Sequence, residues 1–446
     1  MNDQVSIPTS KVQRASRFMK TGARIGGNYM KYYARKTFNG DNNKDSLHED
    51  NAKDIYDSLS QLKGSALKAA QMMSMDKNIL PRAYSSRFSM SQYSAPPLSY
   101  PLVVKTFQRT LGKSPGEIFD TFTRRAANAA SIGQVHRATV NGKHLAVKVQ
   151  YPGVAESVGS DLRMVKPLAM RIMNISEGDF SLYMEEVKDR LLEETDYKLE
   201  LERSVQISEA CEKEVNNIYF PKYYREFSSD KIITMDWIDG MHLKEFLETG
   251  PGQEIRDKIG QTLWDFYDFQ VHKLKMVHAD PHPGNFLFQP DGRVGIIDFG
   301  CVKVIPQEFY DNYFKLYDPA ILKKKKKMTE LFYKNEFITG QDSEREKELF
   351  IPLFKEIITL LGKPFIDGYF DFGDDAFFKQ IYSFSDEMYK NKEVRNSKTA
   401  RGSKHGLYIN RTYFGLYTML NDLKARVNTR TRSDIKKETK LDSFMA

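Results

Sequence analysis

The stretch that decides the fold is His278-Ala279-Asp280-Pro281-His282-Pro283-Gly284-Asn285, which is followed by Asp298-Phe299-Gly300. Between these two motifs, apolar runs flank the turn sequence Pro290-Asp291-Gly292, which predicts a β-hairpin. Asn285 starts the hairpin and Asp298 follows it, so both side chains should lie at the same end. Amide and carboxylate oxygens suit Mg²⁺ as ligands. We therefore expect Asn285 and Asp298 to bind one magnesium ion.

A second hairpin is predicted upstream, around Asn141-Gly142, because both residues tolerate positive φ. Its second strand contains Ala146-Val147-Lys148. An ammonium on a buried strand requires a counter-charge. Glu194, on a helix predicted over residues 181–212, is the expected partner of Lys148.

A strand lysine, a helix glutamate, H-x-D-x-x-x-x-N and D-F-G follow one another in the order found in protein kinases. In that pattern Lys148 contacts the α- and β-phosphates of ATP, and Glu194 keeps Lys148 in place. Asp280 orients or deprotonates the acceptor. His278 is expected to be structural, whereas His282 is either part of the loop scaffold or a phosphate contact. The two histidines are poor zinc candidates because cysteine ligands are absent from this region.

The loop before the first strand departs from the ordinary kinase pattern. A glycine-rich sequence is expected there, but the residues are Ala129, Ala130, Ser131, Ile132, Gly133 and Gln134. Alanine does not reach the backbone conformations of glycine, so this loop should bind the nucleotide differently. Adenine is expected at the backbone that follows the predicted strand Ile232–Met235, at Asp236, Trp237 and Ile238.

The sequence resembles the UbiB/AarF-domain atypical kinases, which include mitochondrial coenzyme Q kinase-like proteins. The matching stretches are the alanine-rich loop from Ala129 to His136, Val147 to Val154, the E-x-D motif Glu194-Thr195-Asp196, and the two motifs quoted first. The resemblance covers roughly residues 52–320. It implies an α+β, atypical protein-kinase-like bilobal fold with an N-terminal helical extension and a mostly helical C-terminal lobe. The implied activity is binding and slow hydrolysis of ATP with Mg²⁺, in support of isoprenoid-quinone biosynthesis or lipid handling at a membrane.

In that family a K-x-G-Q motif on the extension lies over the active site and blocks protein substrates. The corresponding residues here are Lys68-Ala69-Ala70-Gln71, with alanine in place of the glycine. Lys68 and Gln71 are three residues apart, so on a helix both can face one surface. We expect Lys68 to pair with Glu194 or Asp196, and Lys68, Gln71 and Asp196 to gate the site. The alternative is an ordinary amphipathic helix with an exposed lysine.

The net charge of +8 is concentrated near the N-terminus, where eight basic residues and no acidic one lie between Lys11 and Lys36. Aromatic and methionine residues are interleaved with them. Such a segment can lie on an anionic membrane surface, touch nucleic acid or form a solvated arm. Nucleic acid is the least favoured of the three. Gly22, Gly26 and Gly27 should interrupt any helix, which favours an arm.

The domain organisation follows from these features. We expect a basic, flexible arm and linker (1–51), a helical extension with the K-x-G-Q-like helix (52–124), a kinase-like N-lobe with the alanine-rich loop (125–240) and a helical C-lobe (241–446).

Composition excludes several classes of protein. With 446 residues, 40% hydrophobic and 28% charged, the chain is neither wholly disordered nor fibrous. Cys211 and Cys301 cannot form a disulfide framework or a cysteine-rich zinc site. No run of 18 apolar residues occurs, and the first residues lack the features of a secretory signal. We expect a protein in the cytoplasm or peripherally attached to the inner membrane, without a transmembrane helix.

Two classes of function remain open. The first is a phosphoryl-transfer or ATP-hydrolysing enzyme, which the intact Asp280, Asn285 and Asp298 favour. The second is a nucleotide-gated binding protein that uses ATP to change conformation around a lipid or partner. A small-molecule kinase of the aminoglycoside type ranks third, because it lacks the Lys68–Gln71 and Ala129–Gln134 motifs. Expected partners are ATP, an isoprenoid quinone precursor or lipid, and an anionic membrane surface.

Overall fold

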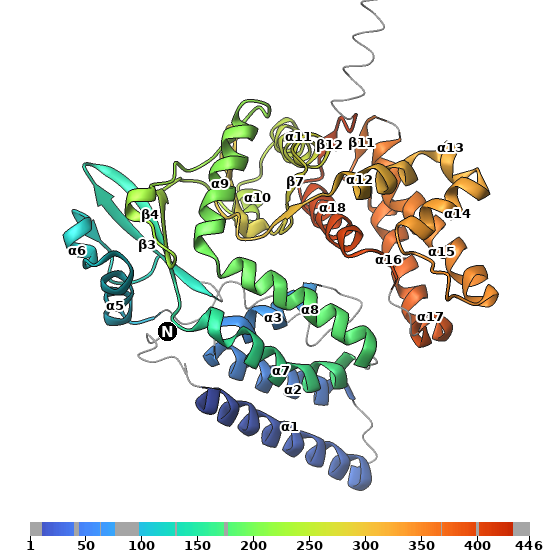
Figure 1. Ribbon diagram of the computed structural model, residues 1–446, viewed down its shortest axis with the longest axis horizontal. Helices are drawn as coiled ribbons and strands as arrows, with labels where there is room; N and C mark the ends of the chain where they lie inside the picture. The colour runs from blue at the N-terminus through green and yellow to red at the C-terminus, as the bar shows by residue number, and fades with distance from the viewer. Residues whose placement is uncertain are drawn as a thin grey trace, which may run out of the picture. The chain divides into compact units, whose positions relative to one another are not determined.

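A computed structural model describes residues 11–39, 44–62, 64–75, 98–129, 132–173, 177–366, 368–397 and 401–430. The chain divides into two compact units (Figure 1). Unit 1 comprises Met1–Leu201 and Lys222–Trp237, and unit 2 comprises Glu202–Pro221 and Ile238–Ala446. The second boundary lies three residues before the one expected at 240. The chain also passes from unit 1 to unit 2 between Leu201 and Glu202, inside a helix. The expected division has no boundary there, so the assignment of residues 202–221 to unit 2 differs from it.

The sheet of unit 1 is antiparallel, in the order β1 (Thr121–Phe122), β3 (Gly133–Val140), β4 (Lys143–Gln150) and β6 (Ile232–Asp236), with β2 (Asn128–Ala129) also paired to β3. The hairpin predicted around Asn141-Gly142 is confirmed, and both turn residues have positive φ, 50° and 75°. One face of β4 packs, with Val147 buried, against helix α5 (Tyr100–Leu111). A short helix α6 (Pro115–Ile118) follows α5.

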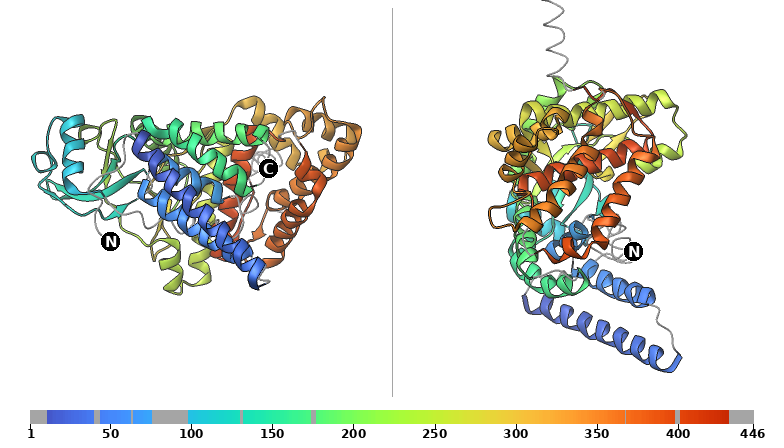
Figure 2. Two further views of the ribbon diagram at one scale, coloured as in Figure 1. Left: turned by 90° about the horizontal axis from the view of Figure 1, so that it is seen from below. Right: turned by 90° about the vertical axis from the view of Figure 1, so that its right-hand side faces the viewer.

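Five helices complete the described part of unit 1. They are α1 (Lys11–Asn39), α2 (Lys44–Leu62), α3 (Gly64–Met75), α7 (Val154–Met173) and α8 (Glu177–Glu194). Helices α2, α3, α7 and α8 share one apolar core, to which Leu59, Leu67, Val158 and Leu191 contribute. Figure 2 shows α1 lying alongside α2.

The basic segment forms a 29-residue helix instead of the expected arm. Helix α1 continues through Gly22, Gly26 and Gly27, which were expected to interrupt it. The physical reason is tertiary packing, which supplies most helical stability in proteins and outweighs the low helix propensity of glycine. On α1, Arg14 forms a buried ion pair with Asp161 of α7, and Tyr32 is buried. The expected linker is also partly helical, since α2 begins at Lys44; residues 40–43 lie outside the described part.

The long helix predicted over residues 181–212 is two helices, α8 and α9 (Tyr197–Glu212). The chain breaks at Thr195-Asp196, where the Asp196 carboxylate accepts a hydrogen bond of 3.1 Å from the backbone N–H of Leu199. An aspartate side chain that satisfies an N-terminal N–H favours the start of a new helix.

The described residues of unit 2 contain three small sheets. Strands β8 (Phe286–Phe288) and β9 (Val294–Ile296) are antiparallel, as predicted for the second hairpin, and β9 also pairs with β5 (Ile218–Tyr219). Strand β7 (Met276–His278) pairs with β10 (Val302–Val304), and β11 (Phe370–Asp371) pairs with β12 (Arg426–Val427). The hairpin core includes Phe286 and Phe288, both fully buried.

Most of the other elements described in unit 2 are helices. Its longer helices are α11 (Gln253–Phe269), α14 (Lys325–Lys334), α15 (Glu344–Gly362), α16 (Asp375–Lys390) and α18 (Lys404–Asp422). Shorter ones are α10 (Leu243–Glu248), α12 (Gln307–Tyr313), α13 (Pro319–Leu322) and α17 (Lys392–Asn396). Trp264 of α11 stacks on Tyr417 of α18 at the centre of the core. Within the described ranges of both units, no helix has the length and apolar character needed to cross a membrane.

Candidate active site

Lys148 lies on the central strand of the unit 1 sheet. On β4 it is opposite Val135 of β3 and Ile233 of β6. Neighbouring Val147 and Val149 point into the core, so the alternation of a strand turns Lys148 to the other face. Its side chain is only 13% exposed, and Nζ donates a hydrogen bond of 2.6 Å to Glu200 Oε1.

The expected partner of Lys148 was Glu194, and this prediction is wrong. The counter-charge is Glu200, in the first turn of α9, and the ring of Tyr197 lies 5.2 Å from Lys148 Nζ. Because the helix breaks at Thr195-Asp196, Glu194 ends α8, and it is Glu200 of α9 that reaches Lys148. The one signal that could have revealed this is Asp196 followed by Tyr197, a helix-start pattern inside what reads as one helix.

Glu194 is instead paired with Lys68 of α3. Lys68 Nζ lies 3.0 Å from Glu194 Oε2, which is one of the two pairings that the sequence left open. Asp196 is exposed and its recorded contact is the cap of α9. Ala70, which occupies the family's glycine position, is buried among apolar residues of α2, α7 and α8. Gln71 belongs to α3, but its side chain lies outside the described part.

His278 ends strand β7 and is fully buried. The Tyr267 hydroxyl lies 3.2 Å from His278 Nδ1, and the His278 backbone N–H donates to Gln270 Oε1 at 2.8 Å. Burial, with a contribution from the Asp280 charge, raises the pKa of Tyr267 well above its ordinary value, so the hydroxyl keeps its proton. These contacts fit the expected structural role of His278. Tyr267, on α11, and Gln270, which directly follows it, were not identified from the sequence, because nothing in this segment marks them.

Asp280, Asn285 and Asp298 are drawn together by the turn and hairpin that follow β7. Asn285 Nδ2 donates to the backbone carbonyl of Asp280 at 2.9 Å. The Ile297 N–H donates to the Asn285 carbonyl at 3.1 Å, so Asp298 lies one residue beyond the end of the ladder. His282 Nδ1 accepts from the Gly284 N–H at 3.0 Å, which is a scaffold contact.

The oxygen atoms of Asn285 and Asp298 suit Mg²⁺, which also binds water and phosphates, better than they suit a metal ion whose ligands all come from the protein. Among the described residues, no group of three or more His, Cys, Asp or Glu could hold a metal ion. Asn285 uses its Nδ2 as a donor, so its Oδ1 is the oxygen that a cation would meet. Two protein oxygens are typical of Mg²⁺, which completes its shell with water and substrate phosphates.

The alanine-rich loop is described in part, since Ala130 and Ser131 lie outside the described residues. Ala129 is half-buried on β2. At Gly133 an added Cβ would lie 2.6 Å from the Tyr197 hydroxyl and 2.9 Å from the Val149 carbonyl. Glycine is therefore required at position 133 because neighbouring atoms leave no room for a Cβ, and not because the backbone has a positive φ. Gly133 links the loop to the same Tyr197 that borders Lys148.

Ile132 and Gln134, both expected at the nucleotide, direct their side chains into unit 1. Ile132 is buried next to Tyr151 and Leu98. Gln134 Oε1 accepts from the Leu98 N–H at 2.6 Å, and its Nε2 lies 2.9 Å from His136 Nε2. Their side chains therefore support the loop from within unit 1.

The expected adenine-binding segment begins at the end of β6. The Asp236 and Trp237 N–H groups donate to the carbonyls of Lys222 and His144, each at 2.9 Å. The Trp237 ring stacks with the guanidinium of Arg137, 4.0 Å from its centroid. Two of the three expected backbone donors are thus used by unit 1 itself, and Ile238 is the first residue of unit 2.

Comparisons with known proteins agree with this geometry. Residues 90–332 match the family described as ABC1 atypical kinase-like domain. The atypical kinase COQ8, mitochondrial, of Saccharomyces cerevisiae is 28% identical, over 83% of this chain and 75% of its own length. The probable serine/threonine-protein kinase abkA of Dictyostelium discoideum is 25% identical, over 95% and 78%.

A solved structure is also similar: the complex of Rv3197 with erythromycin from Mycobacterium tuberculosis. It has 27% sequence identity and a TM-score of 0.56, and the similarity covers 87% of this chain and 95% of that one. The family match spans more than half of the 446 residues and contains Lys148, the E-x-D motif, the H-x-D-x-x-x-x-N motif and D-F-G. The chain therefore belongs to the ABC1 (UbiB/AarF) family of atypical kinases and has its kinase-like α+β fold.

Proposed function

We propose that this protein binds Mg-ATP and turns it over slowly, as an atypical kinase or ATPase that supports isoprenoid-quinone biosynthesis or lipid handling at a membrane surface. The observation that carries the proposal is the Lys148–Glu200 ion pair of 2.6 Å on the central strand. An ammonium that is only 13% exposed and held by a carboxylate is the group that contacts the ATP phosphates in a kinase-like fold.

In this proposal each charged residue has one task. Lys148 contacts the α- and β-phosphates, and Glu200 fixes the position of the ammonium. Asp280 orients the acceptor, or a water molecule, and accepts its proton. Asn285 and Asp298 would hold Mg²⁺, which supplies positive charge to the phosphates when bound. Phosphoryl transfer depends mainly on such positioned charge.

Turnover is expected to be slow because the Lys68–Glu194 contact keeps α3 against α8. We assign Lys68 and Gln71 to a gate on this basis, with Ala70 tightening it through apolar contacts in the helix cluster. This same contact favours the second candidate function, a nucleotide-gated binding protein in which ATP changes the state of α3 without hydrolysis.

A membrane surface is the proposed site of action. Helix α1 carries no acidic residue, and anionic lipids attract each nearby basic side chain by about 1 kcal/mol. Relatives named as mitochondrial COQ8 kinases also favour a membrane over the cytoplasm.

The test is ATP hydrolysis by the purified full chain with Mg²⁺, with and without phosphatidylglycerol vesicles. We expect slow turnover that EDTA removes and that anionic vesicles increase several-fold, whereas phosphatidylcholine vesicles do not. Nucleotide binding without turnover in any of these conditions would contradict the enzyme and favour the nucleotide-gated binding protein.

The partner of Lys148 can be tested separately. Glu200→Gln should lower kcat/KM for ATP by about ten- to a hundredfold, because Lys148 loses its charged partner. The matched control is Glu202→Gln, an exposed residue of the same helix, which should stay within about twofold. If Glu194→Gln lowered kcat/KM as much as Glu200→Gln does, the assignment of Glu200 as the functional partner would be wrong.

A further inference from the structure

The exposed side of α1 carries two parallel stripes. Met19, Gly22, Gly26, Met30 and Tyr33 recur at intervals of three and four residues, so they form one apolar stripe. Both methionines are 71% exposed and Tyr33 is 59% exposed. Exposed apolar side chains gathered on one face often mark a surface that meets a membrane or another molecule.

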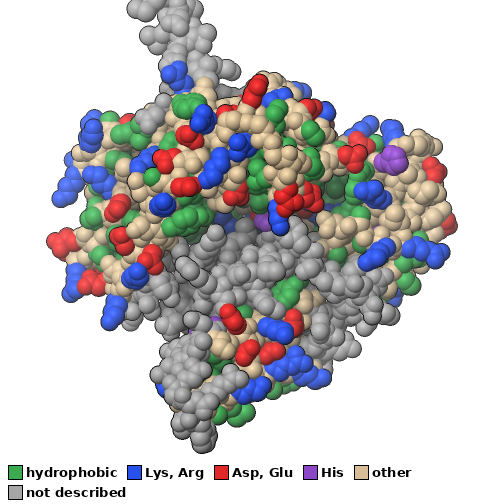
Figure 3. All heavy atoms as spheres, turned by 180° about the vertical axis from the view of Figure 1, so that it is seen from behind, with side chains coloured by type: hydrophobic (Ala, Val, Ile, Leu, Met, Phe, Trp, Pro, Cys, Tyr) green, Lys and Arg blue, Asp and Glu red, His purple; other side chains and the backbone are tan. Residues whose placement is uncertain are grey.

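The second stripe is basic and lies beside the first. Lys20, Arg24, Gly27 and Lys31 follow the same helical spacing, and the three charged side chains are exposed. Over the described part of the face in Figure 3, by contrast, acidic and basic side chains are interspersed. An all-basic helix surface bordered by exposed apolar side chains is typical of a helix that lies in a membrane interface.

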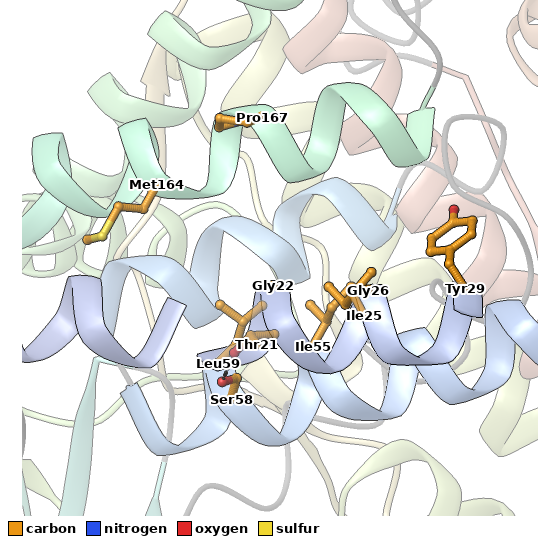
Figure 4. A pocket seen from close by; sticks show the side chains of 10 residues that line it. All are labelled: Thr21, Gly22, Ile25, Gly26, Tyr29, Ile55, Ser58, Leu59, Met164 and Pro167. Atoms are coloured by element: carbon orange, nitrogen blue, oxygen red, sulfur yellow. Dashed lines mark hydrogen bonds between the residues drawn. The ribbon is translucent and has the colours of Figure 1, made fainter. Parts of the chain in front are cut away.

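The two glycines of the apolar stripe open onto a pocket of about 360 Å³. From α1, Ile25 and Tyr29 also line it (Figure 4). Helix α2 contributes Ile55, Ser58 and Leu59, and α7 contributes Met164 and Pro167. The hydroxyls of Ser58 and Thr21 hydrogen-bond to each other in its wall, so the remaining lining is mainly apolar. Size and lining are those of a site for a small apolar ligand.

The glycines create the opening at a cost to the helix. A Cβ added at Gly22 or Gly26 would meet no atom within 4 Å, so neither glycine is needed for a close helix contact. Each lowers helix stability by about 1 kcal/mol relative to alanine. Side chains at these positions would project over the pocket mouth, so what the glycines provide is access to the pocket.

We propose that this pocket takes one hydrocarbon chain of an anionic membrane lipid while α1 lies on the membrane surface. The apolar stripe leads to the mouth, the basic stripe faces the anionic headgroups, and the pocket shields the chain from water. This inference rests on the membrane part of the proposed function and adds the site and the ligand class.

The test compares three forms of the full chain: wild type, G22L/G26L and G27L. Leucine favours a helix over glycine, and Gly27 lies on the basic stripe outside the pocket lining with no atom within 4 Å of an added Cβ. The probe is dodecyl phosphate below its critical micelle concentration, titrated calorimetrically. We expect G22L/G26L to bind it at least about tenfold more weakly than wild type, and G27L to stay within about twofold.

Vesicle sedimentation separates this proposal from the membrane assignment. If the wild type bound dodecyl phosphate but not phosphatidylglycerol vesicles, the membrane assignment would be wrong, whereas the assignment of the pocket to a hydrocarbon chain would stand. Equal binding of dodecyl phosphate by wild type and G22L/G26L, or no binding by wild type, would overturn the pocket. A concentration-dependent dimer lost in G22L/G26L would assign this face to a second copy of the chain and would also overturn it. Circular dichroism monitors folding, and Gly26→Met alone replaces the double variant if that variant unfolds.

Discussion

Asp298→Asn should lower Mg-dependent ATP hydrolysis by about a thousandfold or more, while leaving the fold intact. The substitution keeps the size of the side chain. It also keeps an oxygen at the position that accepts the Gly300 N–H at 2.7 Å, so the local turn should survive. What it removes is the negative charge beside Asn285 at the end of the hairpin.

The loss of activity should be large because the described residues of unit 2 provide few oxygen ligands that could bind Mg²⁺ in place of Asp298. Asn285 supplies a neutral amide, and no cluster of three acidic, histidine or cysteine side chains exists among the described residues to replace the lost carboxylate. A neutral pair of ligands binds Mg²⁺ weakly, and the charge on the phosphates then remains uncompensated in the transition state.

The matched control is Asp386→Asn, the same chemical change at an exposed residue of α16 whose recorded partner is Lys390, one turn away. Its turnover should equal that of wild type. Steady-state hydrolysis at several Mg²⁺ concentrations gives the comparison. If Asp298→Asn kept more than about a tenth of the wild-type rate at all of them, Asp298 would not be the metal ligand and the proposed chemistry would fail.

The parts of the site that were predictable are those encoded by local chemistry. Asn141-Gly142 and Pro290-Asp291-Gly292 specify their turns, and each turn fixes the register of a hairpin. Register then determines that Lys148 leaves the buried face of β4 and that Asn285 and Asp298 share one end. No long-range information is needed for any of these steps.

The errors come from features that the sequence does not mark clearly. Glu194 and Glu200 are six residues apart in a glutamate-rich segment, and only the helix break at Asp196 decides which one reaches Lys148. Gln134 sits in a motif that suggests nucleotide contact, yet its side chain is used to fix Leu98, 36 positions earlier. A local break inside what reads as one helix decides the first case, and a contact between distant segments decides the second. A single sequence marks the first only weakly and the second not at all.

Helix α1 is the clearest such case and leads to a second prediction, that Asp161→Ala destabilises the attachment of α1 by about 3–5 kcal/mol. Asp161 is fully buried on α7, 147 positions from Arg14, which donates to it through Nε at 2.6 Å and through Nη2. The hydroxyls of Ser157 and Ser65 donate to the same carboxylate. Alanine would leave the guanidinium buried without this carboxylate.

Hydrogen exchange followed by mass spectrometry measures the effect on α1 itself. Exchange of α1 amides should rise at least about a hundredfold in Asp161→Ala, since the helix opens locally once its charge partner is lost. Glu156→Ala, an exposed carboxylate of the same helix, is the control and should change stability by less than about 1 kcal/mol. Unchanged α1 protection in Asp161→Ala would mean that apolar contacts alone attach the helix.

The double variant Arg14→Met/Asp161→Leu separates the strength of the pair from the penalty of breaking it. Replacing both charges of a buried pair by apolar side chains is often neutral, because the desolvation penalty disappears together with the attraction. We therefore expect α1 protection in the double variant to return to within about tenfold of wild type. Such a recovery would mean that the ion pair mainly specifies where α1 docks, while the helix owes its stability to Tyr32 and its other apolar contacts. That division explains why glycines that open a pocket are tolerated in α1: packing on its buried face, and not helix propensity, keeps this segment helical.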